Sequence, residues 1–369
     1  MSESYDVVVV GCGGAGAATT WWLARHGVRV LAIDRFDALH SRGSSHGTER
    51  IVRVAYAEPV YVELARESLT MWRELDAAAG GTLLRTVGGI DTGFARELER
   101  IARGCDAGGV PYEWLDADAA RQRFPGLRTD ERALFQPDAA CVDAQRALDA
   151  FARAAVAAGA TIRRSETVTT IEPHGDGVDV RSDRTEYRAG AVVVTTGAWA
   201  HATLAGIVPL PPITVTQEQV AFFRPAPGVA FPTFIDRREV SYYGLPTPTG
   251  LVKVGEHYTG PVVDPDTRTG ELEPRTWQRL LDWVRANVPG VDPEPVAHST
   301  CLYASAPDED FVVDRVGPVT VGVGLGGHGF KFLPILGRRL AEIATGSPWR
   351  ENPFDLARTP RPEGSSAHK

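Results

Sequence analysis

Lysine is scarce in this chain. Of 39 lysines and arginines in 369 residues, only Lys253, Lys331 and Lys369 are lysine. Arginine therefore supplies nearly every positive charge, although it cannot replace an ammonium group whose pKa must shift on burial. Lys253 and Lys331 lie in the apolar stretches LVKVG and GFKFL, which favours a functional ammonium at each. The alternative is a lysine retained by chance or exposed on an edge strand.

Other features are missing as well. The net charge is −8 and there is no basic tract, which argues against binding to nucleic acid or to an anionic membrane surface. No apolar run approaches the roughly 20 residues of a membrane span. The chain enters its first strand almost at once, which predicts no signal peptide and a cytoplasmic protein. Four widely spaced cysteines predict neither a disulfide framework nor a metal site.

The stretch 5–34 predicts a dinucleotide-binding unit. A buried strand rich in valine leads into a turn, a helix and a second buried strand. Gly11, Gly13 and Gly16 fit G-x-G-x-x-G, which permits a tight turn, close approach of a pyrophosphate, and close packing of helix on strand. Asp34 ends the second strand, where it could accept hydrogen bonds from a ribose. The alternative is a βαβ unit whose glycines serve only its turns.

A polar loop follows this unit and contains His46, Arg50 and Arg53. The two arginines are three residues apart, so they could lie on one side of a helical turn. Two arginines and a histidine close behind the glycine motif suit an anionic ligand or an electron-rich ring. The alternative is a solvated loop with surface arginines.

From Thr214 the chain becomes mostly β-strand, which predicts a second sheet. In LVKVGEH, strand alternation places Lys253 and His257 on the same face. Cys301 and Tyr303 share one face of a later strand in the same way.

Two further glycine motifs follow strands of the first domain. Gly197 ends a buried strand over 188–196, and GLGGHGFKF follows a strand over 320–324. Lys331 then precedes a helix predicted over 335–344, whose N-terminus would stabilise negative charge near a cofactor ring.

The chain is long enough for two domains. We expect an α/β fold with an α+β second domain, in which a sheet-rich domain is inserted into a discontinuous dinucleotide-binding domain. The predicted ranges are 1–85, 142–212 and 308–356 for the first domain, 86–141 and 213–307 for the second, and 357–369 for a mobile tail.

Together these motifs make the chain resemble the monomeric sarcosine oxidase and N-methyltryptophan oxidase family of flavin amine oxidases. The resemblance covers about residues 6–344. It rests on GCGGAG, SSHGTERIVRVAY, TTGAW, YYGLP, KVGEH, CLY…PDEDFVVD and GGHGFKF. It implies an FAD-binding, Rossmann-like domain of the glutathione-reductase type with an antiparallel-sheet substrate domain.

The resemblance also implies roles for single residues. Cys301 would attach covalently to the flavin 8α-methyl group, and Lys253 would promote the reaction with oxygen. Arg53 and Lys331 would bind the substrate carboxylate. Further implied residues are Arg50 and His46 near the flavin ring, His257, Tyr243, Tyr303 and Ile235 along the substrate cavity, and Gly327 and Gly329 at the cofactor.

This sequence departs from the family pattern in three places. Ser45-His46 stands where the family often has two histidines. Thr48-Glu49 replaces Asp-Thr, and Ile235 replaces a frequent methionine. These differences concern the identity of the substrate more than the type of reaction.

The predicted function is FAD-dependent oxidation of a carboxylate-bearing secondary amine, such as sarcosine, N-methyltryptophan or a cyclic imino acid. The amine becomes an imine while oxygen becomes hydrogen peroxide, and the expected partners of the monomer are these small molecules alone. One alternative is a dehydrogenase or biosynthetic tailoring enzyme of the same fold that uses another substrate or acceptor. Another is a non-catalytic dinucleotide sensor.

Overall fold

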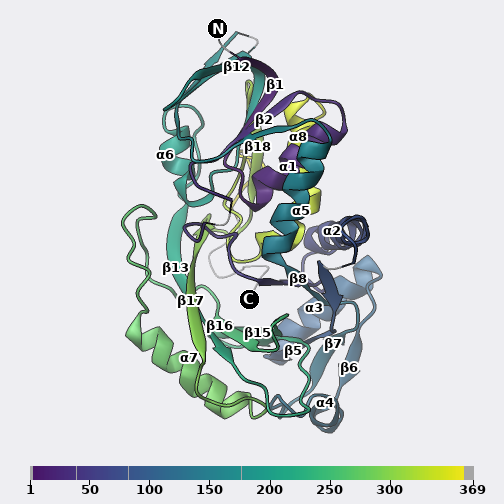
Figure 1. Ribbon diagram of the computed structural model, residues 1–369. Helices are drawn as coiled ribbons and strands as arrows, with labels where there is room; N and C mark the ends of the chain where they lie inside the picture. Colours follow the sequence, from purple (N-terminus) through teal and green to yellow (C-terminus); the bar gives the residue numbers. More distant parts are fainter. Residues whose placement is uncertain (1–2, 39, 82, 176, 361–369) are drawn as a thin grey trace. The chain divides into compact units, whose positions relative to one another are not determined.

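The computed structural model describes residues 3–38, 40–81, 83–175 and 177–360. It divides the chain into two compact units, and the chain passes repeatedly from one to the other (Figure 1). The first unit contains residues up to 47, residues 145–215 and the described residues from 302 onward; the second contains 48–144 and 216–301. Most of the predicted mobile tail, 361–369, lies outside the described residues.

An eight-stranded sheet forms the centre of the first unit. Its order is β10-β11-β12-β1-β2-β9, with β19 beside β12 and β18 beside β19. The β12–β1, β1–β2, β2–β9 and β12–β19 pairs are parallel, and the remaining pairs are antiparallel. The strands are β1 (Glu3–Val10), β2 (Val30–Ile33), β9 (Thr161–Arg163), β10 (Val168–His174), β11 (Gly177–Ser182), β12 (Glu186–Val194), β18 (Val312–Val316) and β19 (Val319–Val323).

The valine run at 7–10 forms the inner end of β1, where β12 and β2 flank it and all four side chains are buried. Burial on both faces accounts for its uninterrupted apolar sequence. Helices pack closely here, since a Cβ on Gly337 of α8 would lie 2.7 Å from the Ala18 Cβ of α1. The helices are α1 (Gly14–Arg25), α5 (Ala144–Ala157), α6 (Ala200–Leu204) and α8 (Leu333–Ala344), with 3-10 turns η1 (Gly197–Trp199) and η2 (Gly329–Phe332).

The second unit is built on another eight-stranded sheet. Its order is β17-β13-β16-β15-β14-β5-β7-β6. The pairs from β13 to β14 and from β5 to β6 are antiparallel as predicted, but β14 pairs with β5 in parallel. The strands are β5 (Gly89–Gly93), β6 (Glu113–Leu115), β7 (Ala133–Gln136), β13 (Thr214–Phe223), β14 (Thr233–Arg237), β15 (Ser241–Pro246), β16 (Val252–Glu256) and β17 (Ala297–Ser305).

A three-stranded sheet, β3-β8-β4, completes the second unit. Arg50 lies in its strand β3 and Arg53 just beyond, so the predicted helical turn is wrong. The β-branched residues Ile51 and Val52 favour a strand, and β3 pairs along its length with β8. The strands are β3 (Glu49–Val52), β4 (Leu84–Thr86) and β8 (Ala140–Asp143), and the helices are α2 (Pro59–Ala78), α3 (Ala95–Gly108), α4 (Ala117–Arg123) and α7 (Pro274–Asn287).

The first segment of the first unit ends at residue 47, earlier than the first segment predicted for the dinucleotide-binding domain. Residues 48–85 belong to the second unit, because β3 and β4 both pair with β8 there. A pairing between strands about 90 residues apart leaves no local signal in the sequence. The assignment of one domain to the cofactor and the other to the substrate stays a prediction.

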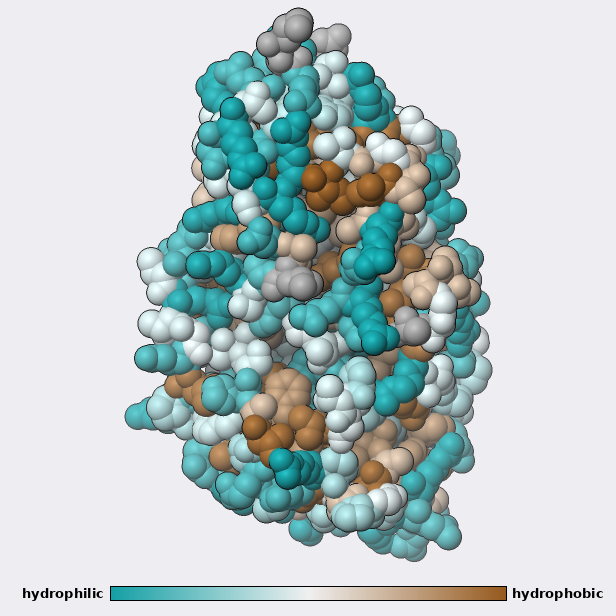
Figure 2. Space-filling view, in the orientation of Figure 1, coloured by the Kyte–Doolittle hydropathy of each residue, from teal (hydrophilic) through white to brown (hydrophobic). Residues whose placement is uncertain are grey.

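The surface in Figure 2 is mainly hydrophilic, and its hydrophobic areas are small and separated. Within the described residues, every helix is too short or too polar to cross a membrane.

Candidate active site

The glycine motif of the first unit lies between β1 and α1, and crowding explains its glycines. Gly11 has φ +88°, and a Cβ there would lie 2.8 Å from the Thr195 carbonyl oxygen. A Cβ on Gly16 would lie 1.8 Å from the Gly11 carbonyl oxygen. No side chain fits at either position, so the turn and the start of α1 approach as the dinucleotide fingerprint requires.

Asp34 follows β2 and is fixed beside this turn. Its Oδ2 accepts a hydrogen bond from the Cys12 amide at 2.6 Å, and its Oδ1 accepts one from the Phe36 amide at 2.8 Å. Each carboxylate oxygen keeps a second lone pair for a ribose hydroxyl. Cys12 is a packing residue, because burial raises the pKa of its thiol to about 12.

The local structure fits the dinucleotide part of FAD. The first turn of α1 carries no acidic residue, so its positive end is available to a phosphate. Gly197, which follows β12, has φ +54°. A Cβ built on it would have no atom of a described residue within 4 Å. Such space at the end of a parallel strand suits a bound cofactor. His46 lies in the same unit and is half-buried.

The late glycine loop holds Lys331 rigidly. Lys331 lies in η2, just before α8, and its Nζ donates to the His328 carbonyl oxygen at 2.8 Å. The His328 ring stacks on Phe311 with centroids 4.7 Å apart. A Cβ on Gly329 would lie 2.5 Å from the Leu325 Cβ, so this glycine is needed for packing. Gly327 lies in the turn between β19 and η2.

A buried cationic centre lies in the second unit. Lys253 of β16 is 8% exposed, and its Nζ donates to the Glu49 carbonyl oxygen at 3.4 Å. Arg50 donates from Nη1 to the same oxygen at 2.7 Å. Burial, followed by the charge of Arg50, lowers the pKa of Lys253 to about 8. This amine therefore changes charge close to physiological pH.

Cys301 of β17 belongs to the same centre and is partly exposed. Burial raises the pKa of its thiol, while the charges of Arg50 and Lys253 lower it. Cations beside a thiol stabilise the thiolate. Tyr303 lies two residues further along β17, so the strand pleat gives both side chains the same face, as predicted.

Two predicted cavity residues of the second unit lie on adjoining strands, and a third, His257, directly follows β16. Ile235 of β14 is opposite Tyr243 of β15. The rings of Tyr243 and His257 are 6.2 Å apart at 82°. A Cβ on Gly255 would lie 2.9 Å from the Tyr243 hydroxyl oxygen, so this glycine makes room for the ring.

Arg53 is buried in the second unit, and an aromatic ring orients it. Its guanidinium carbon lies 3.9 Å from the Tyr56 ring centroid, and Nη1 donates to the Ala55 carbonyl oxygen. Stacking fixes the plane of a guanidinium and leaves other N–H groups for a carboxylate. Gln136 holds the backbone here, since its Oε1 accepts from the Val54 and Ala55 amides at 3.2 Å each.

Sequence reasoning missed several of these supports. Gln136 gave no signal, because a single glutamine at a strand end is common. In the sequence, Glu49 stands out only as a departure from the family pattern. The buried Asp91–Arg237 pair joins β5 to β14 with Nε and Oδ1 2.6 Å apart, and each partner is unremarkable in sequence.

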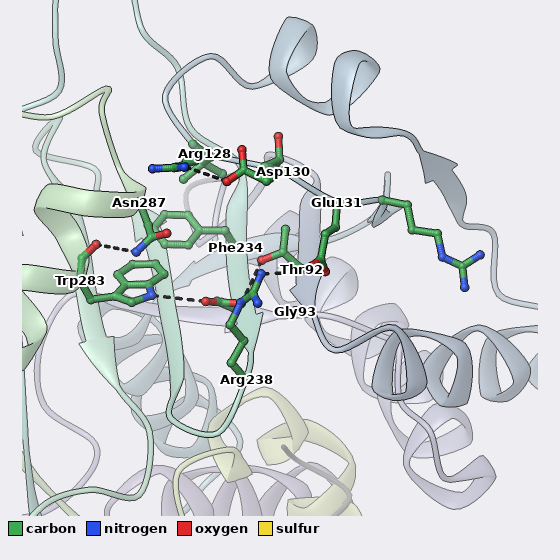
Figure 3. Close-up of a pocket in the computed structure, with 13 residues that line it drawn as sticks. Thr92, Gly93, Arg128, Asp130, Glu131, Phe234, Arg238, Trp283 and Asn287 are labelled. Atoms are coloured by element: carbon green, nitrogen blue, oxygen red, sulfur yellow. Dashed lines mark hydrogen bonds and ion pairs between the residues drawn. The ribbon is translucent and has the colours of Figure 1, made fainter.

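A separate small pocket lies within the second unit (Figure 3). Its volume of about 40 Å³ suits ordered water rather than an amino acid. Trp283 donates from Nε1 to Asp236 Oδ2 at 3.3 Å along its wall, and none of the predicted site residues lines it. We therefore do not assign the substrate to this pocket.

The chain belongs to the family of FAD-dependent oxidoreductases, whose model matches residues 6–343. It is 34% identical to monomeric sarcosine oxidase of Streptomyces avermitilis, over 93% of this chain and 94% of that protein. It is 31% identical to N-methyl-L-tryptophan oxidase of Yersinia pestis, over 96% and 97%. The structure of a Tyr258Phe mutant of NikD, an amino acid oxidase essential for nikkomycin biosynthesis, has a TM-score of 0.87 at 32% identity, covering 97% of this chain and 98% of that one.

These findings confirm the fold class and the resemblance predicted from the sequence. They also confirm FAD as the cofactor and a flavin-dependent amine oxidase as the class of enzyme. The roles of the single site residues stay predictions.

Proposed function

We propose that this protein oxidises a secondary amine bearing a carboxylate, such as an N-methyl amino acid or a cyclic imino acid, and that oxygen becomes hydrogen peroxide. The observation that supports this most is the cationic centre in which Lys253 and Arg50 donate to one carbonyl oxygen. Sarcosine and N-methyl-L-tryptophan oxidases among the relatives support the substrate class. The proposal includes a cytoplasmic monomer without nucleic-acid or membrane partners, in keeping with the net charge of −8.

In this proposal Arg53 and Lys331 bind the substrate carboxylate. Arg53 is fixed by Tyr56 and Ala55, and Lys331 is fixed by His328. Two anchored cations orient the amine, so that the bond to be broken has a defined direction. Tyr243, His257, Tyr303 and Ile235 line the cavity and select the rest of the substrate.

FAD supplies the redox chemistry when bound, accepting a hydride equivalent from the carbon beside the amine nitrogen. Gly11, Gly13, Gly16 and Asp34 would hold its dinucleotide part. Gly197, Gly327, Gly329, His46 and Arg50 would lie along the rest of the cofactor. Lys253 provides a fixed positive charge that stabilises the negative charge oxygen gains during reduction.

We further propose that Cys301 attaches FAD covalently. Purified protein should be yellow, and acid precipitation should leave the colour in the pellet. Cys301→Ala should release the colour into the supernatant, because no thioether bond then forms. Cys105→Ala is a matched control that removes a buried cysteine of α3, away from the proposed site, and should leave the colour in the pellet.

Yellow colour in the wild-type supernatant would exclude the covalent bond while leaving FAD binding intact. A colourless protein that FAD cannot reconstitute would contradict the proposed function itself. If the flavin is covalently bound, the next experiment is a screen of secondary amines in which hydrogen peroxide release is measured.

The anchoring role of Arg53 predicts a selective defect. Arg53→Lys keeps the charge but loses the stacking and the forked geometry, so KM for the amine should rise about 10-fold with kcat little changed. The measurement compares a carboxylate substrate with its neutral amide. An equal loss on both would show that Arg53 does not recognise the carboxylate.

The second candidate is a biosynthetic tailoring enzyme, favoured by the similarity to NikD over nearly the whole chain. It shares the cofactor and the type of reaction but takes a different amine. A substrate screen in which cyclic imino acids react and N-methyl amino acids do not would favour it.

A further inference from the structure

The carboxyl group of Glu49 is buried in the cationic centre, and the mechanism above does not use it. Glu49 begins β3 and is 1% exposed. Apart from an interaction with the neighbouring Thr48 hydroxyl, its two carboxylate oxygens have no hydrogen-bond partner among the described residues. Leaving a buried carboxyl in this state is costly, so a fold that keeps one needs a compensating interaction or a use for it.

The backbone of Glu49 brings this carboxyl within electrostatic range of Lys253, although the described structure shows no direct ion pair between the two side chains. The carbonyl oxygen of Glu49 accepts hydrogen bonds from both Lys253 Nζ and Arg50 Nη1. The carboxyl group therefore belongs to the same residue that both cations contact. Thr48 and Arg50 flank Glu49 in the sequence, and Asp143 on β8 is directly opposite Glu49. The other nearby titratable groups are Cys141 on β8, Arg85 on β4, Lys253 on β16 and Cys301 on β17.

Burial acts on the two groups in opposite directions. It raises the pKa of Glu49, whereas the Thr48 hydroxyl and the charge of Lys253 lower it. It lowers the pKa of Lys253, whereas the negative charges of Cys301 and Glu49 raise it. Each group therefore favours the charged form of the other. Asp143 opposes the ionisation of Glu49, and Arg50 favours it.

We infer that Glu49 is a positioning residue that sets the charge of Lys253, its carboxylate holding the Lys253 amine as an ammonium at neutral pH. Thr48, Arg50 and Arg85 cannot fill this role, since none carries a negative charge. Cys301 would also carry none once bonded to the flavin, and Asp143 is not among the main charges that act on Lys253. The value of the ammonium for the oxygen reaction rests on the proposed function, but the coupling between the two side chains does not.

The scarcity of lysine makes this coupling directly measurable. Holoenzyme labelled with 13Cε-lysine should give three lysine signals, because the chain contains only three lysines. Lys253→Arg removes one signal and so assigns it. In Glu49→Gln the titration midpoint of the Lys253 signal should fall by roughly 1–3 pH units, as expected for loss of a nearby opposite charge.

Two variants serve as controls. Glu49→Asp keeps the charge and should keep most of the wild-type midpoint. Glu239→Gln removes the same charge from an exposed position of the second unit and should leave the midpoint unchanged. An unchanged midpoint in Glu49→Gln, or an equal shift in Glu49→Asp, would overturn the inference.

Wild-type protein provides a test that survives misfolding of the variants. Its Lys253 signal should show a second, smaller step at the lower pH where Glu49 gains its proton, and a single step would overturn the inference. Oxidase activity is measured separately. Coupling without activity contradicts the proposed function alone, and activity without coupling contradicts this inference alone.

Discussion

Replacing Lys253 with methionine is expected to slow the reaction with oxygen by about two to three orders of magnitude. Reduction of the enzyme by its amine substrate should change little. In the proposed function the ammonium of Lys253 is the fixed charge that stabilises negative charge on oxygen, and methionine fills a similar volume without that charge. Stopped-flow absorbance measures both half-reactions in the same sample.

The pH dependence follows from the same group. Lys253 has a pKa of about 8, below its ordinary value of 10.5, so the ammonium is present below about pH 8 and is lost above it. The oxygen reaction of the wild type should therefore fall as the pH rises through about 8. Lys253→Met should lack this step.

Lys331→Met provides the matched control, because it also removes a buried lysine charge. It should raise KM for the amine and leave the reaction of the reduced enzyme with oxygen intact. If Lys253→Met slowed both half-reactions equally, the assignment of Lys253 to oxygen would be wrong.

The second large effect concerns folding. Asp91→Asn is expected to lower the free energy of unfolding by about 3–5 kcal/mol, because it leaves a buried guanidinium without its counter-charge. Arg237 is 1% exposed and Asp91 is 4% exposed, and the pair joins β14 to β5 at their parallel junction. Burial already lowers the pKa of Arg237, and the charge of Asp91 opposes that shift. Urea denaturation monitored by tryptophan fluorescence measures the change.

The double variant Asp91→Leu/Arg237→Met is its control. It removes both charges and fills the space with apolar groups, so much of the lost stability should return. Glu131→Gln, at an exposed site of the same unit, should change stability by less than about 0.5 kcal/mol. A single variant as stable as the wild type would show that Asp91 does not balance Arg237.

The dinucleotide unit could be predicted because its determinants are local. The valines of β1, the glycines at 11, 13 and 16, and Asp34 lie within one short stretch, and each has a single physical reason. The prediction of a functional ammonium at Lys253 has a different basis. In a chain that otherwise uses arginine, a lysine between valines stood out without any knowledge of its neighbours.

The surroundings of Arg50 and Arg53 could not be predicted in this way. Their spacing of three residues is typical of a helical turn, but pairing with β8, far along the chain, makes β3 a strand. Non-local strand pairing overrides a short local pattern, because hydrogen bonds to the partner strand satisfy the backbone.

The sequence by itself determined the class of this protein and its cofactor, since these depend on residue type at fixed local spacing. Only the tertiary structure decided how the candidate site residues are held and charged. Lys253 is buried near Arg50 and Glu49 because strands distant in sequence come together. The ion pair between Asp91 and Arg237 depends on distant strands in the same way. A pKa depends on desolvation and on the distance to other charges, and both exist only after the chain has folded.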